Sequence, residues 1–142
     1  MTASSSDTED ITLYISALEE RITENNSDPE YVKDYRRAQL YQVQGLFAES
    51  LICLERAMTD ARPFKYDFIW ERTFLSIGTL FASNLDYFDK LDEAEDVYIE
   101  LLRSHPDGDF LCDYAIFLHK RRRDYNKAEM LVLEVARPNS SQ

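Results

Sequence analysis

The stretches LDEAEDVYIELL, residues 91–102, and YNKAEMLVLEV, residues 125–135, decide the fold. Each begins with an apolar or aromatic residue and reaches an alanine three positions later. A large apolar residue follows four positions after the alanine, and another three positions after that. Apolar residues at these intervals lie on one face of an α-helix. Because Ala94 and Ala128 are 34 residues apart (128 − 94 = 34), the pattern predicts two similar helices in repeated surroundings.

A third stretch shows the same pattern earlier in the chain. It starts at Phe47, places the small residue Ser50 three positions later, and continues to Leu54 and Ala57. The spacing from Ser50 to Ala94 is 44 residues (94 − 50 = 44), so the middle of the chain carries additional residues. Periods of roughly 20 to 50 residues are typical of stacked structural repeats.

Turn and capping signals divide the chain into about seven helices. Gly45 supplies a left-handed stop after the second helix, and Gly78 lies where a neighbouring helix can approach closely. Asp109 and Asp124 are placed to cap the last two helices, as Ser6 is in a capping box before the first. Helices joined by short connections pack as antiparallel neighbours. The predicted fold class is therefore all-α.

We expect one helical domain over residues 8–138, between disordered ends at residues 1–7 and 139–142. Three antiparallel helical hairpins follow an extra N-terminal helix in this organisation. The expected parts are a capping helix at 8–25 and hairpins at 29–61, 66–105 and 109–137.

In its repeats the chain resembles the tetratricopeptide repeat family, over roughly Pro29 to Pro138. The spacing of 34 residues and the motifs at residues 113–118 and 124–129 carry the resemblance. It implies hairpins stacked in a right-handed superhelix, in which the small residue of each motif allows the two helices of a hairpin to touch. Trp70, the only tryptophan, departs from the family pattern. The alternative is a generic helical bundle, because all amphipathic hairpins look alike.

The resemblance also implies a concave groove, lined by the first helix of each hairpin, that receives another polypeptide. A rigid groove binds a segment with little ordering cost on its own side. We therefore expect a protein–protein interaction module or adaptor, with a constitutive structural subunit of a larger assembly as the alternative. The groove positions carried over from the family are Tyr35, Gln39 and Gln42, then Thr79, Ser83 and Tyr87, and finally Asp113, Phe117, Lys120 and Arg121.

Two features suggest what such a groove binds. Lys120, Arg121 and Arg122 form the one basic run of an acidic chain, so a partner with an acidic or carboxylate group is one hypothesis. The alternative is a solvated helix end, where cations favour the helix dipole. The helix at 8–25 is expected to cap the array, although it could instead occupy the groove.

The last predicted helix carries more apolar residues than one covered side requires. Met130 to Leu133 are all apolar, and Val135 and Ala136 follow. Arrays of repeats usually end on a polar face. We therefore expect self-association through the last hairpin, as a homo-oligomer, or a partner at that face.

Composition restricts the classes of partner and the compartment. The chain has 142 residues and a formal net charge of −11, and acidic surfaces repel phosphate backbones and anionic lipids. We expect no nucleic acid and no membrane insertion, since no apolar run approaches the length of a spanning helix. Cys53 and Cys112 lie in apolar helical stretches where buried reduced thiols are usual. A cytoplasmic location is the expectation.

The sequence also argues against an enzyme and against a bound cofactor or metal. His105 and His119 are the only histidines, and two ligands are too few for a zinc site. Phosphate-binding and nucleophile motifs are absent from the sequence. An enzyme with an unrecognised site, built on two buried carboxylates, is the remaining alternative.

Overall fold

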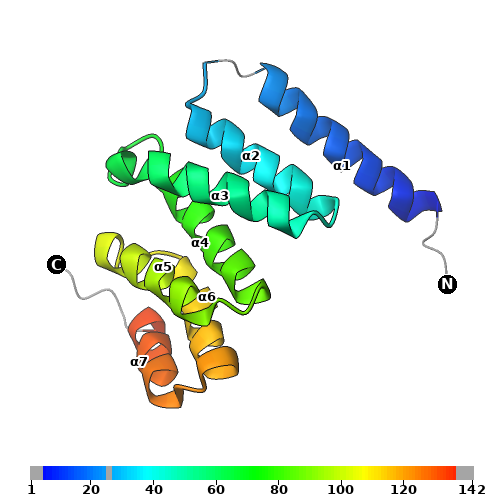
Figure 1. Cartoon of the computed structure of the whole chain (residues 1–142). Helices are drawn as coiled ribbons and strands as arrows, with labels where there is room; N and C mark the ends of the chain where they lie inside the picture. Colours follow the sequence, from blue (N-terminus) through cyan, green and yellow to red (C-terminus); the bar gives the residue numbers. More distant parts are fainter. Residues whose placement is uncertain (1–4, 25–26, 137–142) are drawn as a thin grey trace. The chain divides into compact units, whose positions relative to one another are not determined.

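A computed structural model describes residues 5–24 and 27–136 of the chain, with side chains at 12–22 and 27–134. These residues form seven α-helices and no strand, which confirms the predicted fold class and number of helices (Figure 1). The expected disordered ends lie mostly outside the described residues, as do the side chains of the capping box at Ser6. The helices are α1 (Ser5–Glu24), α2 (Glu30–Val43), α3 (Phe47–Ala61), α4 (Glu71–Tyr87), α5 (Leu91–Ser104), α6 (Phe110–Phe117) and α7 (Tyr125–Ala136).

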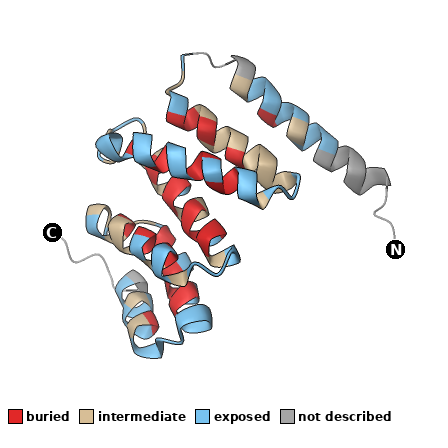
Figure 2. Cartoon of the chain, in the orientation of Figure 1, coloured by how far each residue is buried: buried red, intermediate tan, exposed pale blue. Residues whose placement is uncertain are grey.

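The helices gather into two compact units, residues 1–63 and 64–142. A short 3-10 helix, η1 (Arg62–Phe64), lies at the boundary. A five-residue π-helix, η2 (Leu118–Arg122), continues α6 in the second unit. In each unit the buried residues lie on the helix faces that meet one another (Figure 2). Every helix among the described residues is too short or too polar to cross a bilayer.

The first unit is the hairpin of α2 and α3, with α1 packed beside α2 (Figure 1). Gly45 ends α2 with a φ of 78°, as the sequence predicted, and the Leu46 amide donates to the Tyr41 carbonyl at 2.8 Å. Ser50 is fully buried, and its hydroxyl donates to the Ala38 carbonyl of α2 at 2.9 Å. The small residue of the first motif therefore lies at the contact between the two helices, where the pattern placed it.

The second unit is built from α4 and α5, followed by α6, η2 and α7 (Figure 1). Gly78 of α4 meets Leu101 of α5 so closely that a Cβ at this position would lie 2.6 Å from Leu101 Cδ2. The prediction of a close helix approach at Gly78 is confirmed. Ala94 and Ala128, the small residues of the other two motifs, are both buried.

One helix start and one helix cap differ from the predictions. The fourth helix was expected from Tyr66 but begins at Glu71, because the Asp67 carboxylate accepts the amides of Ile69 and Trp70 and holds a turn there. The Asp109 side chain makes no capping hydrogen bond, whereas Asp124 accepts the Lys127 amide at 3.2 Å and caps α7 as predicted.

Candidate protein-binding surface

The groove residues predicted on α2 share one face of the first unit. Tyr35, Gln39 and Gln42 are spaced four and three residues apart, and all three are partly buried. The Gln42 amide oxygen lies 3.2 Å from the Ser50 hydroxyl, which ties that side chain to α3. Tyr35 and Gln39 remain candidates on this helix for contact with a partner.

The groove residues predicted on α4 likewise share one face, in the second unit. Thr79, Ser83 and Tyr87 are spaced four residues apart. The Thr79 hydroxyl donates to the Leu75 carbonyl at 2.8 Å, while Ser83 and Tyr87 are exposed. A groove that continues from α2 to these residues stays a prediction.

The four groove residues predicted on α6 and η2 have different surroundings. Asp113 and Lys120 are exposed. Phe117 is only 3% exposed, and its ring lies 5.4 Å from the Tyr98 ring. Phe117 therefore belongs to the core and not to a binding surface, because its ring packs on Tyr98 of α5.

Arg121 and Arg122 of the basic run bind carboxylates of the same unit. Arg121 Nε lies 2.6 Å from Asp86 Oδ1, and its Nη2 also contacts Asp89. Arg122 contacts Asp92 and Glu95, each at 2.9 Å. These two guanidinium groups fasten η2 to the end of α4 and the start of α5, an arrangement that neither sequence hypothesis for the run included.

Glu95 is the centre of a polar cluster between α5 and the last hairpin. Its carboxylate accepts hydrogen bonds from Tyr114, Arg122 and Lys127 at 2.9 to 3.0 Å. Burial by itself raises the pKa of Glu95, but the hydrogen bonds from Lys127, Tyr114 and Arg122 outweigh burial and lower the pKa below the ordinary glutamate value. The cluster fixes which side of α6 and α7 faces α5.

The opposite side of the last hairpin is exposed and largely apolar. The ring of Tyr114 on α6 stacks on the ring of Tyr98 on α5, with centroids 5.0 Å apart. The row formed by Ile116 of α6 and His119 of η2 therefore points away from α5. On α7, Lys127 points to Glu95, whereas Tyr125 lies roughly 160° away around the helix.

The rings of His119 and Tyr125 join these two rows, with centroids 4.9 Å apart. Ile116 and Tyr125 are each 53% exposed, Val132 is 54% exposed and Leu133 is 61% exposed. Exposed residues of both helices therefore make one continuous surface. We call this surface the end face and define it as Ile116, His119, Tyr125, Glu129, Val132 and Leu133.

The surplus of apolar residues predicted for the last helix is confirmed by this exposure. Met130, beside the end face on α7, is 70% exposed. The sequence indicated this surplus because the last helix carries more apolar residues than one buried side of a helix accommodates. The sequence could not show that α6 and η2 add Ile116 and His119 to the same surface, because that depends on how the hairpin packs.

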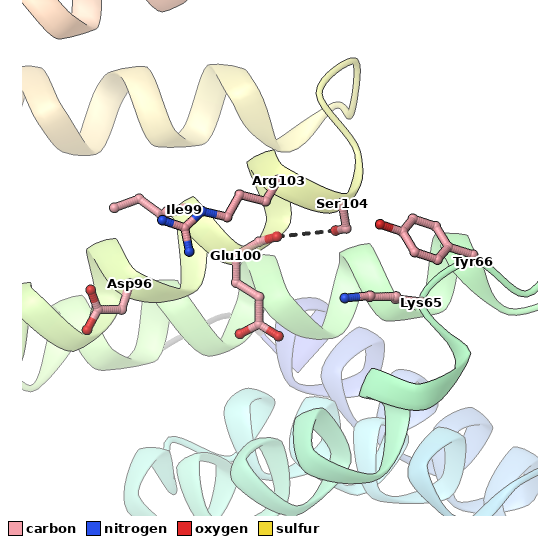
Figure 3. Close-up of a pocket in the computed structure, with 7 residues that line it drawn as sticks. All are labelled: Lys65, Tyr66, Asp96, Ile99, Glu100, Arg103 and Ser104. Carbon is pink, nitrogen blue, oxygen red and sulfur yellow. Dashed lines mark hydrogen bonds between the residues drawn. The ribbon is translucent and has the colours of Figure 1, made fainter.

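A pocket of about 510 Å³ lies elsewhere in the second unit, between α5 and the turn after η1 (Figure 3). Most of the residues that line the pocket lie on α5, and the lining residues together carry two positive and two negative charges. The Ser104 hydroxyl donates to the carbonyls of Glu100 and Leu101, so it is held to its own helix. The lining residues are Lys65, Tyr66, Asp96, Ile99, Glu100, Arg103 and Ser104.

The cysteines and histidines have contrasting surroundings. Cys53 is buried, and burial raises the pKa of its thiol. Cys112 is exposed, so the expectation of a buried thiol is wrong there, because its position on α6 faces away from α5. His105 Nδ1 lies 3.0 Å from the Ser104 hydroxyl, and His119 packs on Tyr125. Among the described side chains, no three potential metal ligands come together.

Comparisons with protein families, with curated proteins and with solved structures found no significant match for this chain.

Proposed function

We propose that the chain is a protein–protein interaction module of stacked, tetratricopeptide-like hairpins, and that its end face binds a partner polypeptide. The observation that carries this proposal is the exposure of Ile116, Tyr125, Val132 and Leu133 on helices whose other sides are packed. Contiguous exposed apolar surface on a folded unit marks interaction sites.

The position of the end face supports the same proposal. It lies on the side of the third hairpin that faces away from α5, which is the side that a further hairpin would cover in a longer array. The burial of Ser50, Ala94 and Ala128 at the three motif positions favours hairpins of the tetratricopeptide kind. A polypeptide that packs on this side would bury the exposed apolar side chains.

A groove that receives an acidic segment is the second candidate function. The exposure of Ser83, Tyr87 and Lys120 favours it. The contacts of Arg121 and Arg122 with Asp86 and Asp92 weaken it, because a partner carboxylate must displace an internal one. A constitutive subunit differs from an adaptor only in how permanently the end face is covered.

Site-specific photo-crosslinking in the native source tests the proposal. A photoreactive amino acid at Tyr125 is expected to yield discrete crosslinked products, while the same group at the exposed Glu93 of α5 serves as the matched control. Excess unlabelled wild-type chain should compete for the products, and a Val132→Asp chain should not. Products at Ser83 and Tyr87 but not at Tyr125 would favour the groove, and products from no position would contradict both.

A further inference from the structure

We propose that the end face binds an amphipathic helix whose apolar stripe is accompanied by Lys or Arg, an inference that rests on the proposed function. The end face presents two neighbouring rows of side chains, from α6 with η2 and from α7, joined by the contact of His119 with Tyr125. A helix placed along two antiparallel helices fits its side chains into the rows between them. Binding of an amphipathic helix in this way is a common mode of peptide recognition.

The charge on the end face sets the sign of the partner. Glu129 lies between Tyr125 and Val132 on α7, at spacings of four and three residues, so it is on the same side of the helix. It is exposed and has no ion-pair partner among the described residues. The one cation of α7, Lys127, is directed to Glu95 on the other side.

Lys127 aside, none of the described cations near Glu129 in sequence forms an ion pair with it, and this includes the exposed Arg123 and Lys120. Arg121 and Arg122 are engaged with Asp86, Asp89, Asp92 and Glu95. An apolar partner helix that covered Glu129 without a cation would bury an unpaired carboxylate, which is costly. A Lys or Arg beside its apolar stripe removes that cost.

A second copy of the chain is the competing occupant, and charge disfavours it. Each copy carries a net charge of −11, so pairing of two copies brings like charges together. A basic helix is attracted by the same field.

Peptide binding to the full chain tests the inference. The probe is a synthetic amphipathic helix of about 18 residues with a Leu stripe and Lys at its margins, and the matched peptide carries Glu in place of Lys. Fluorescence anisotropy measures both affinities. We expect the wild-type chain to prefer the Lys peptide by at least ~10-fold.

Charge substitutions separate the end face from general attraction to an acidic chain. Glu129→Lys is expected to weaken the Lys peptide by about 5- to 10-fold, whereas Glu93→Lys, the same charge change on α5, should weaken it less than about 2-fold. Val132→Asp should abolish binding without loss of helical circular dichroism, because Val132 is exposed. Equal effects of Glu129→Lys and Glu93→Lys would overturn the inference, since they would indicate attraction to net charge alone.

Failure of this inference is distinguishable from failure of the proposed function. Crosslinks at Tyr125 together with a preference for the Glu peptide would support binding at the end face. The same result would overturn the inference that the partner helix carries Lys or Arg. A dimer in sedimentation velocity at neutral pH and low salt, where repulsion between copies is strongest, that Val132→Asp dissociates would overturn it in favour of a second copy.

Discussion

At the scale of single residues, the close contact between Gly78 of α4 and Leu101 of α5 allows a direct test of the packing in the second unit. Overpacking a core costs roughly 1 to 3 kcal/mol, and the better helix propensity of alanine returns about 1 kcal/mol. Leu101 is fully buried and has little room to move. The net range is about 0 to 2 kcal/mol, and because Leu101 cannot move away we expect Gly78→Ala to lower the free energy of unfolding by the upper half of it, about 1 to 2 kcal/mol, measured by urea denaturation.

A double-mutant cycle shows whether Leu101 is the cause. Leu101→Ala alone should cost about 2 to 5 kcal/mol. In that background Gly78→Ala is expected to be neutral or stabilising, because the methyl group then enters the space that Leu101 vacates. Additive losses in the double mutant would mean that the two residues do not meet as described.

Glu95 gives a prediction about pH. Because the folded protein holds the pKa of Glu95 below its unfolded value, the stabilisation is complete above the unfolded pKa and is lost as the pH falls through the folded pKa. At pH 7, Glu95→Gln is expected to lower the free energy of unfolding by about 1 to 3 kcal/mol. The difference from wild type should narrow below about pH 4.3.

Asp92 provides the control for Glu95, since it pairs with the same arginine at the surface. Its side chain is 88% exposed and lies 2.9 Å from Arg122. Asp92→Asn should change stability by less than about 0.5 kcal/mol at any pH, because exposed ion pairs contribute little. Denaturation curves for both variants at pH 7 and pH 3.5 make the comparison; a loss for Glu95→Gln that is independent of pH would contradict the ion-pair explanation.

Single residues also show what the sequence could and could not predict. The buried positions of Ser50, Ala94 and Ala128 were predictable because helical periodicity places them on one face. The burial of Phe117 was not, because Asp113 is the only charged residue of α6 and the apolar residues on all sides of the helix do not single out a buried face. The partners of Arg121 and Arg122 are 27 to 35 residues away in sequence, so only tertiary packing reveals them.

At the scale of elements, α7 depends on its cap. Asp124 accepts the Lys127 amide at the start of this helix, whereas Asp109 makes no such bond at the start of α6. Asp124→Ala is expected to cost about 1 kcal/mol and to speed hydrogen exchange of the α7 amides. Asp124→Asn should retain most of the stability, and Asp109→Ala should be within about 0.5 kcal/mol of wild type. Equal losses for the two alanine variants would contradict the difference in capping.

The sequence predicted the boundary of a helix correctly where a residue's own backbone conformation sets that boundary. Gly45 ended α2 because its φ of 78° suits glycine. Asp67 delayed α4 by bonding two amides ahead of the helix, a competition that the apolar pattern of the helix does not register. Asp89 has a positive φ, as Gly45 does, and α5 begins two residues after it, at Leu91.

At the scale of the whole molecule, net charge and the end face act in opposite directions on association. The charge of −11 separates copies at neutral pH and low salt, while the exposed apolar side chains of the end face favour contact. Salt shortens the range of repulsion from about 10 Å at 0.1 M to about 3 Å at 1 M. It leaves the apolar contribution largely intact.

The two modes of association should therefore respond to salt with opposite signs. Raising NaCl from 0.1 M to about 1 M is expected to strengthen any pairing of copies and to weaken binding of the Lys peptide by several-fold, because salt screens repulsion and attraction alike. Sedimentation velocity measures the first effect and anisotropy the second, with Val132→Asp as the control that removes both. Lowering the pH towards the isoelectric point near 4.6 should promote pairing for the same reason. A Lys peptide that binds more tightly at high salt would mean that apolar contact alone holds it, and Glu129 would then have no part in choosing the partner.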